Sequence, residues 1–218
     1  MLSKLKTALI IGATGLTGGI LLDKLIEDDS FKKIKLFSRS SVEQKSPKIE
    51  EHLIDMFKLD KYADDFKGDV VFCCIGTTKS KTPDKETYKK IDYGIPVKAA
   101  KLAQTNGIKT FIVISALGAD TNSSVFYNRT KGEMQRDVLK QNIENTYILQ
   151  PSLIVGDRNE ARFGENVAEF FMKTLGFLIP RKYKMIHAET IAKAMIVLTK
   201  IDFSEIIITS ETIKEIAE

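Results

Sequence analysis

Short apolar runs alternate along the chain with segments in which apolar residues recur every three or four positions. The runs are typical of strands buried in a parallel sheet, and the longer periodic segments are typical of helices that cover it. Glycine or polar residues separate the two kinds of segment. The pattern predicts strands at 7–11, 34–37, 49–55, 70–75, 110–115, 146–155 and 206–209.

The predicted helices lie between these strands, so neighbouring strands should run parallel and the sheet should be covered on both faces. Pro96 lies inside one helix and predicts a bend or a restart there, and Pro151 marks the exit of the sixth strand. We predict one doubly wound α/β domain with a small substrate-side cap at 156–183. The predicted helices are 15–26, 88–104, 125–141, 165–175, 188–198 and 211–217.

The composition limits the class of protein. A length of 218 residues with 43% hydrophobic and 28% charged residues fits one globular domain. The net charge is +4 with both signs interleaved, and no run reaches the roughly 18 apolar residues of a membrane span, so neither a nucleic-acid nor a membrane partner is expected. Cys73 and Cys74 are neighbours on a predicted strand and should not pair, and reduced thiols predict a cytoplasmic location. The oligomeric state stays open.

A glycine-rich turn follows the first strand and opens the first helix. Gly12 permits a tight turn, Gly15 lets a pyrophosphate approach the backbone, and Gly18 lets the helix pack closely. Thr14 and Leu16 flank the approach, and the N–H groups at the helix start should face the anion. This spacing predicts a nicotinamide dinucleotide site in a Rossmann fold. A glycine-rich turn without a ligand is the alternative.

The end of the second strand indicates which dinucleotide is bound. A site for NAD(H) usually places a carboxylate there to hold the ribose diol, whereas this chain has Ser38 and Arg39. Arg39 can pair with a 2′-phosphate and Ser38 can add a hydroxyl, so we predict NADP(H) in preference to NAD(H). An ordinary surface arginine is the alternative. Asp55 and Met56, after the third strand, either border the adenine or cap a helix.

The other strand ends supply the nicotinamide side of the predicted site. The backbone at Gly76 and Thr77 follows the fourth strand and should line the cofactor. Pro151, Ser152 and Leu153 follow the sixth strand and should pass beneath the nicotinamide.

Tyr127, Lys131 and Ser115 are the candidate catalytic residues. Tyr127 and Lys131 are four residues apart in a predicted helix and therefore share a face. The lysine cation, with the positive nicotinamide ring of the oxidised cofactor, should lower the pKa of the phenol, which can then exchange a proton with a carbonyl oxygen. Ser115 can hydrogen-bond the same oxygen, and Lys131 can also hold the nicotinamide ribose. Tyr and Lys at this spacing also occur on ordinary half-exposed helices, and a serine at a strand end also occurs in ordinary turns.

These motifs resemble the atypical branch of the short-chain dehydrogenase/reductase superfamily, and more narrowly the Tat-interacting-protein oxidoreductases and their bacterial relatives. The resemblance covers most of the chain and implies an NADP(H)-binding fold with a Ser-Tyr-Lys site. The commoner members carry an Asn on the helix before the fifth strand, for which Asp92 and Tyr93 are the polar candidates here. The resemblance rests on Gly-Ala-Thr-Gly-Leu-Thr-Gly (12–18), Phe-Cys-Cys-Ile-Gly-Thr-Thr (72–78), Ser-Ala-Leu-Gly-Ala-Asp (115–120), Tyr-Asn-Arg-Thr-Lys-Gly-Glu (127–133) and Gln-Pro-Ser-Leu-Ile-Val-Gly-Asp-Arg (150–158).

The sequence thus predicts an NADP(H)-dependent oxidoreductase that acts on a small carbonyl or quinone-like substrate, with Tyr127 as proton donor. The alternative is a non-catalytic NADPH-binding regulatory or scaffold protein with a protein partner, as the regulatory role of the vertebrate relatives suggests. A nucleotide-sugar epimerase is less favoured, because the stretch after Pro151 is short for a substrate lobe. No metal site is predicted. Arg158, Arg162 and Glu165 form a polar cluster that either faces substrate or is structural.

Overall fold

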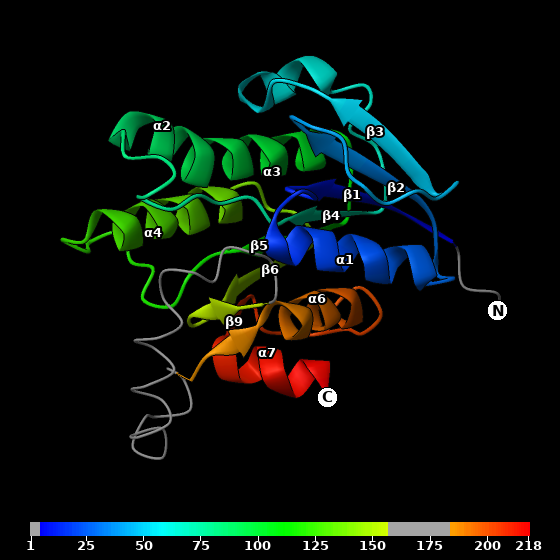
Figure 1. Ribbon diagram of the computed structural model, residues 1–218. Helices are drawn as coiled ribbons and strands as arrows, with labels where there is room; N and C mark the ends of the chain where they lie inside the picture. The colour runs from blue at the N-terminus through cyan, green and yellow to red at the C-terminus, as the bar shows by residue number, and fades with distance from the viewer. Residues whose placement is uncertain (1–4, 157–183) are drawn as a thin grey trace.

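The computed structural model describes residues 5–156 and 184–218, which form a seven-stranded parallel sheet with helices on both faces (Figure 1). The sheet order is β3-β2-β1-β4-β5-β6-β9, so the chain winds outward from β1 in both directions. This confirms the predicted doubly wound α/β fold. The strands of the sheet are β1 (Lys6–Ile11), β2 (Phe31–Ser38), β3 (Ile49–Leu53), β4 (Val70–Cys73), β5 (Thr110–Ile114), β6 (Asn145–Gln150) and β9 (Ile207–Thr209).

Two layers of helices bury the two faces of this sheet (Figure 1). Ala8 and Ile10 of β1 pack into one apolar cluster, whereas Leu9 and Ile11 pack into the other, because successive side chains of a strand point to opposite faces. One face is covered by α1 (Leu16–Glu27), α6 (Ala188–Val197) and α7 (Ser210–Ala217), and the other by α2 (Lys85–Lys89), η2 (Lys90–Gly94), α3 (Ile95–Thr105) and α4 (Phe126–Leu139), with the 3-10 segment η1 (Met56–Tyr62) beside them.

The register of the strands brings their carboxyl ends to one level. Ile11 of β1 lies opposite Phe37 of β2 and Cys73 of β4, and Cys73 lies opposite Val113 of β5. Val113 in turn lies opposite Ile148 of β6. The residues that follow these strands, at which the sequence places its candidate site, therefore share one edge of the sheet.

The helix predicted at 88–104 contains a wide π turn immediately before Pro96. The N–H of Ile95 donates to the carbonyl of Lys90, five residues back instead of four. Pro96 has no N–H to offer the carbonyl of Asp92, and a wider turn accommodates that missing bond. The bend predicted at Pro96 is thus a π turn, and the Asp92 side chain within it is buried.

The strand predicted at 146–155 is two strands. β6 ends at Gln150, before Pro151, which cannot donate a ladder hydrogen bond. Ile154 and Val155 form β7, which pairs in parallel with β8 (Ile186–His187) in a separate two-stranded sheet. The predicted cap (156–183), with its helix and with Arg158, Arg162 and Glu165, lies outside the described residues apart from Gly156.

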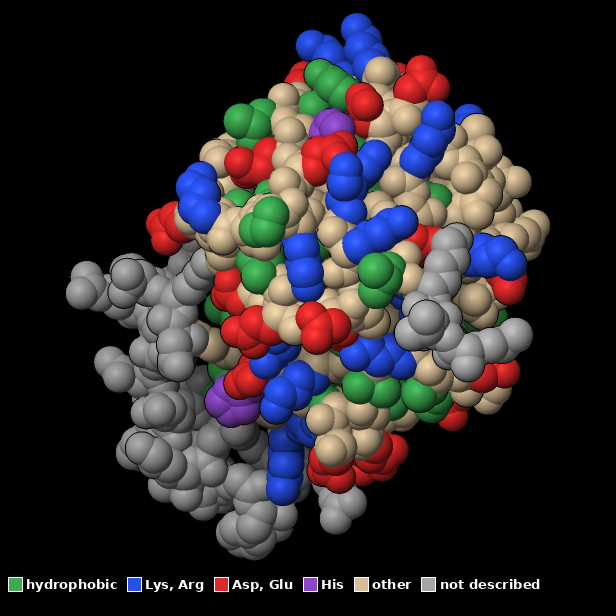
Figure 2. Space-filling model, turned by 90° about the vertical axis from the view of Figure 1, so that its right-hand side faces the viewer, with side chains coloured by type: hydrophobic (Ala, Val, Ile, Leu, Met, Phe, Trp, Pro, Cys, Tyr) green, Lys and Arg blue, Asp and Glu red, His purple; other side chains and the backbone are tan. Residues whose placement is uncertain are grey.

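Charges of both signs interleave over the face of the molecule shown in Figure 2. This arrangement agrees with the mild net charge of +4. Each helix in the described part of the chain is too short or too polar to cross a membrane. Within residues 5–156 and 184–218, no three His, Cys, Asp or Glu side chains are grouped so that they could hold a metal ion.

Candidate functional site

The glycine turn between β1 and α1 is fixed by backbone contacts that leave no room for side chains. Gly12 has φ +91°, in the left-handed region, and a Cβ there would lie 3.0 Å from the carbonyl of Cys74. A Cβ on Gly18 would lie 2.1 Å from the carbonyl oxygen of Gly12. That oxygen also accepts a hydrogen bond of 3.0 Å from the N–H of Gly15. The turn therefore requires glycine at 12 and 18 for the fold itself.

The start of α1 suits an anionic ligand. Gly15 is the N-cap residue, no side chain caps the helix, and its first turn has no acidic residue. Thr14 and Gly15 are exposed, and Leu16 is half-buried beside Gly156, where a Cβ would lie 2.9 Å from a Leu16 methyl group. The positive end of a 12-residue helix dipole thus points to an open surface made by glycine, which fits a dinucleotide pyrophosphate.

At the end of β2, Ser38 and Arg39 face different surroundings. Ser38 is buried and its hydroxyl donates to the carbonyl of Ser40 at 2.7 Å, so its proton holds the loop. Arg39 is exposed. Both residues were predicted to meet a 2′-phosphate. The Arg39 guanidinium is at the surface, whereas the Ser38 hydroxyl is engaged within the loop.

Asp55 and Met56 lie at the start of η1. One carboxylate oxygen of Asp55 accepts the N–H of Phe57 at 3.0 Å, and this hydrogen bond lowers the pKa of the carboxyl. Met56 is buried in the core. The geometry of Asp55 is that of a helix cap, one of the two alternatives that the sequence left open. Its contact with adenine stays a prediction.

A buried ion pair joins α4 to the π turn. The Nζ of Lys131 lies 2.9 Å from Oδ1 of Asp92, and both side chains are less than 5% exposed. The other oxygen of Asp92 accepts the N–H of Thr77 at 2.8 Å, and Lys131 also donates to the carbonyl of Ile114 at 3.5 Å. A Cβ on Gly76 would lie 3.5 Å from Asp92. Asp92 therefore links the loop after β4 to the candidate catalytic lysine.

Tyr127 lies one turn before Lys131 on α4, and the residue is 38% exposed. Burial of the hydroxyl raises its pKa; the charge of Lys131 lowers it, but the carboxylate of Asp92 opposes that effect. Lys131 thus lowers the pKa of Tyr127 as predicted, but burial, the largest cause, leaves that pKa raised overall. Tyr88 packs edge-on against Tyr127, with ring centroids 6.5 Å apart, and donates to the carbonyl of Thr77.

Ser115 is buried at the end of β5 and is contacted by a glutamine pair. The Nε2 of Gln135 donates to the hydroxyl oxygen of Ser115 at 2.6 Å, and Nε2 of Gln150 donates to Oε1 of Gln135 at 3.2 Å. Gln135 is not among the site residues predicted from the sequence. Its signal was spacing, since it follows Tyr127 and Lys131 at intervals of four residues along α4.

The exit of β6 is tied to the neighbouring loops. The carbonyl of Pro151 accepts the N–H of Leu117 at 3.0 Å. The Ser152 hydroxyl donates to the carbonyl of Lys184. It also lies 3.0 Å from the hydroxyl of Ser210. Leu153 is 57% exposed. These contacts hold the backbone after β6 at the edge of the sheet, where the nicotinamide side of the site was predicted.

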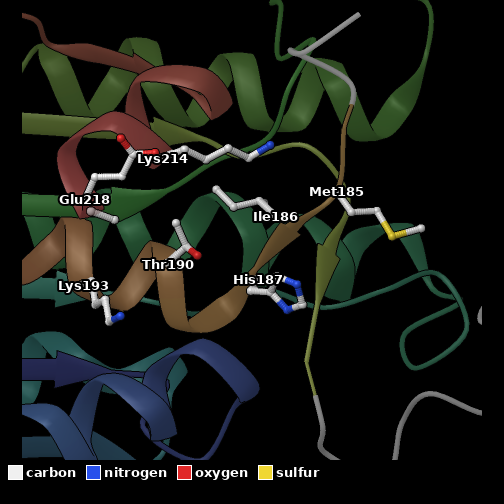
Figure 3. Close-up of a pocket in the computed structure, with 8 residues that line it drawn as sticks. Met185, Ile186, His187, Thr190, Lys193, Lys214 and Glu218 are labelled. Carbon is white, nitrogen blue, oxygen red and sulfur yellow. The ribbon is translucent and has the colours of Figure 1, made fainter. Parts of the chain in front are cut away.

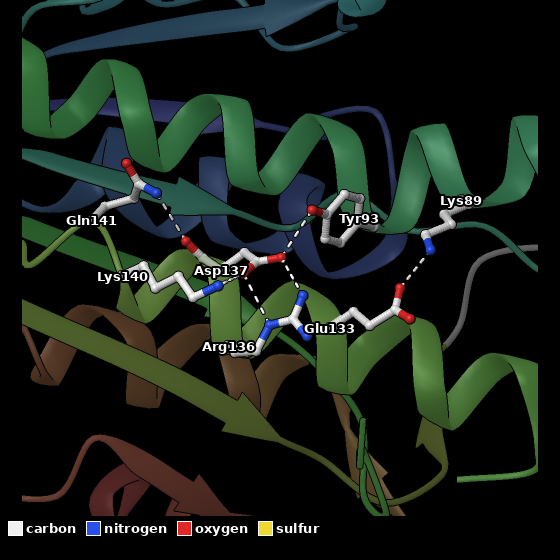
Figure 4. Close-up of polar contacts among 7 residues, drawn as sticks. All are labelled: Lys89, Tyr93, Glu133, Arg136, Asp137, Lys140 and Gln141. Atoms are coloured by element: carbon white, nitrogen blue, oxygen red, sulfur yellow. Dashed lines mark hydrogen bonds and ion pairs between the residues drawn. The ribbon is translucent and has the colours of Figure 1, made fainter. Parts of the chain in front are cut away.

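Two other features stand apart from this edge. An open hollow of about 310 Å³ lies beside β8, α6 and α7 (Figure 3), and none of the candidate site residues lines it. A polar network covers the outer face of α4 (Figure 4). There Asp137 accepts hydrogen bonds from Tyr93, Arg136 and Lys140, which hold the pKa of its carboxyl well below the ordinary value. We place the candidate site at the carboxyl edge of the sheet beside the glycine turn, because the strands that precede the candidate residues end there.

The fold and this edge define a dinucleotide-binding protein. The sequence profile of the NAD(P)H-binding family matches residues 12–160, and the chain belongs to that family. It is 34% identical over 185 residues to Protein HTATIP2 of Rattus norvegicus, a match that covers 80% of this chain and 76% of that protein. It is 30% identical over 194 residues to Protein FMP52, mitochondrial, of Candida albicans, covering 86% and 85%. These relatives confirm the resemblance to short-chain oxidoreductases of the Tat-interacting-protein type.

Solved structures share the fold at low sequence identity. The ADP-L-glycero-D-manno-heptose-6-epimerase of Helicobacter pylori superposes with a TM-score of 0.70 and 17% identity, covering 97% of this chain and 80% of that chain. The UDP-glucose 4-epimerase of Thermotoga maritima gives a TM-score of 0.71 and 16% identity, covering 97% and 82%. At this identity the likeness concerns the Rossmann fold alone.

The comparisons correct one expectation. Several fungal relatives are named mitochondrial, including that of Candida albicans and that of Eremothecium gossypii. The cytoplasmic location predicted from the cysteines is therefore wrong as an inference. Reduced thiols point away from an oxidising compartment but do not select one among the reducing compartments.

Proposed function

We propose that the protein is an NADP(H)-dependent oxidoreductase that reduces a small carbonyl or quinone-like substrate, with Tyr127 as the proton donor. One observation carries the proposal. The buried Asp92–Lys131 pair, 2.9 Å long, fixes a cation behind an exposed tyrosine at the same sheet edge as the glycine turn. A buried charged pair is costly to maintain for stability alone, so its position beside Tyr127 supports a chemical role.

The arrangement of Tyr127 suits proton donation. The bound reduced nicotinamide would supply a hydride to the carbonyl carbon. Tyr127 would then give its hydroxyl proton to the carbonyl oxygen, so that the C=O group becomes an alcohol, and Ser115 would hydrogen-bond that oxygen. The raised pKa of Tyr127 keeps the phenol protonated and ready to donate.

The end of β2 supports NADP(H). Residues 38–40 offer no carboxylate for a ribose diol, and Arg39 is exposed there to pair with a 2′-phosphate. Gly12, Gly15 and Gly18 would hold the pyrophosphate at the start of α1. Pro151, Ser152 and Leu153 would flank the nicotinamide, and Lys131 the ribose.

The edge near Tyr127 supports an apolar substrate. Val125 at the start of α4 and Leu153 after β6 are 55% and 57% exposed, and Tyr127 is 38% exposed. Exposed apolar groups gathered at one site are typical of ligand-binding surfaces. Small aromatic aldehydes and quinones fit this chemistry better than sugars do.

The test follows NADPH absorbance with para-nitrobenzaldehyde and with menadione. Tyr127→Phe should lower kcat by about 10²–10⁴ while the Kd for NADPH stays close to that of the wild type. Tyr147→Phe, the same change inside β6 and away from the site, should leave kcat unchanged. Equal activity of Tyr127→Phe and wild type would show that the proton comes from another group. Fluorescence titration should give tighter binding of NADPH than of NADH, and Arg39→Ala should abolish the difference.

The same assay decides the alternative. If the wild-type protein bound NADPH tightly but oxidised it with none of the substrates tested, it would be a cofactor-binding regulatory protein with a protein partner. That outcome would remove the proposed reduction and leave the cofactor site in place.

A further inference from the structure

The hydrogen bonds around the Ser115 hydroxyl determine where its proton points. A serine hydroxyl can donate one hydrogen bond and accept two. Here the oxygen accepts from Nε2 of Gln135 at 2.6 Å, and Ser115 is only 4% exposed. Among residues 5–156 and 184–218, no acceptor takes the Ser115 proton, although neighbouring polar groups in the core are paired.

A hydrogen bond from Gln150 fixes the orientation of the Gln135 amide. Gln135 is 8% exposed and extends from α4 toward β5 and β6. Its Oε1 accepts from Nε2 of Gln150, the last residue of β6, at 3.2 Å. Because the oxygen end of the amide faces Gln150, the N–H end faces Ser115, and the Ser115 oxygen is thereby the acceptor.

We infer that Gln135 is a positioning residue of the site: it occupies an acceptor position of the Ser115 hydroxyl and so directs the Ser115 proton toward the carbonyl oxygen of the substrate. The inference rests on the proposed function and deepens it. A hydroxyl held as a donor stabilises the negative charge that develops on that oxygen during reduction, whereas a hydroxyl free to turn inward does so only part of the time. The site therefore selects substrates that present an acceptor oxygen beside Tyr127.

Gln135→Glu reverses the polarity of this contact with little change in shape. A carboxylate only accepts hydrogen bonds, so at pH 8 it should draw the Ser115 proton inward. We expect kcat to fall by about 10², the loss expected when one such donor is removed, with little change in the Kd for NADPH. When the pH is lowered, the protonated glutamic acid can again donate to Ser115, and kcat should recover toward the wild-type value measured at the same pH. Gln104→Glu, the same change on the exposed face of α3, should follow the wild-type pH profile.

A double-mutant cycle separates positioning from a structural role. Gln135→Met removes the donor without adding charge and should lower kcat by about tenfold. In a Ser115→Ala background it should cause no further loss of kcat, because no hydroxyl remains to be directed. Circular dichroism and NADPH titration verify that each variant is folded.

The outcomes distinguish the two proposals. Additive losses in the cycle, or a Gln135→Glu profile without recovery at low pH, overturn the role of Gln135 while the reduction stands. A wild type that reduces neither para-nitrobenzaldehyde nor menadione overturns the proposed function, and the role of Gln135 with it.

Discussion

Asp92→Asn removes one charge from the buried ion pair and keeps the shape of the side chain. At 2.9 Å and an effective dielectric constant of about 20, the attraction between Asp92 and Lys131 is about 6 kcal/mol before desolvation is subtracted. Removing one partner of a buried pair costs about 3–5 kcal/mol, because the other charge stays buried and uncompensated. Asparagine also has one acceptor oxygen for two donors, Lys131 and the N–H of Thr77. We expect a loss of about 3 kcal/mol.

Thermal unfolding measures this loss. For a chain of this length, each kcal/mol lost from the free energy of unfolding lowers the unfolding midpoint by about 2–4 °C, so the midpoint of Asp92→Asn should fall by about 6–12 °C. Asp60→Asn is the matched control, because Asp60 pairs with Lys98 at 2.8 Å with side chains 60% and 34% exposed. Exposed pairs contribute little, and this control should melt like the wild type. If Asp92→Asn and Asp60→Asn melted at the same temperature, the ion pair could not hold the lysine as we argue.

The same substitution should change the pH dependence of the reverse reaction. Alcohol oxidation needs the Tyr127 phenolate, and the carboxylate of Asp92 is one of the causes that raise the pKa of Tyr127. Removing it lowers that pKa, so the rise of oxidation rate with pH should move to lower pH in Asp92→Asn. The measurement is NADP⁺ reduction with an alcohol across alkaline pH. A shift to higher pH would contradict the sign of this interaction.

Three further predictions concern the scaffold. Gly18→Ala places a methyl group 2.1 Å from a carbonyl oxygen of the turn and should lower both the unfolding midpoint and NADPH affinity, whereas Gly94→Ala, 3.9 Å from its nearest contact, should do neither. Burial raises the pKa of the Cys73 thiol to about 12 and also raises that of the partly buried Cys74 thiol, so iodoacetamide should label Cys73 at neutral pH only once the protein is unfolded in guanidinium, and Cys74 only slowly before that. Asp137→Asn should cost about 1 kcal/mol at pH 7, because its partners are half-exposed. The pKa of Asp137 is lowered by folding, so this difference, measured by urea unfolding, should be present above about pH 4 and disappear as the pH falls further.

The sheet could be predicted from the sequence because its signal is local. Most strands contain an apolar run of buried residues, as in Val70–Cys73, and the glycine turn follows the first of them. The exception is β3, which reads Ile-Glu-Glu-His-Leu and has no fully buried residue. The amino end of β2 was missed. It begins at Phe31, which is fully buried, but the exposed Lys32 and Lys33 interrupt the apolar run there.

The contacts that organise the site could not be predicted, because they join residues far apart in the chain. Asp92 was one of two polar candidates on its helix, and only its burial and its contact with Lys131 distinguish it from Tyr93, which faces Asp137 on the outside. The π turn that carries Asp92 depends on one missing hydrogen bond, and the sequence predicts a bend at Pro96 but not the width of the turn. The spacing of Gln135 from Tyr127 and Lys131 places it on their face of α4, but its contact with Ser115 joins residues 20 positions apart and has no local signal.

The contact between Gly18 and the carbonyl of Gly12 has a consequence for how related sequences are interpreted. Because a methyl group at 18 collides with the turn whether or not a ligand is present, descendants of this fold that have lost the dinucleotide would still keep those two glycines. At Gly15 a Cβ would lie 3.3 Å from its nearest contact, a distance that a small shift of the turn can relieve. In relatives that no longer bind the ligand, position 15 is therefore the first glycine of the turn that we expect to be substituted. A bulky residue at that position indicates a relative that has lost the dinucleotide site and acts as a scaffold.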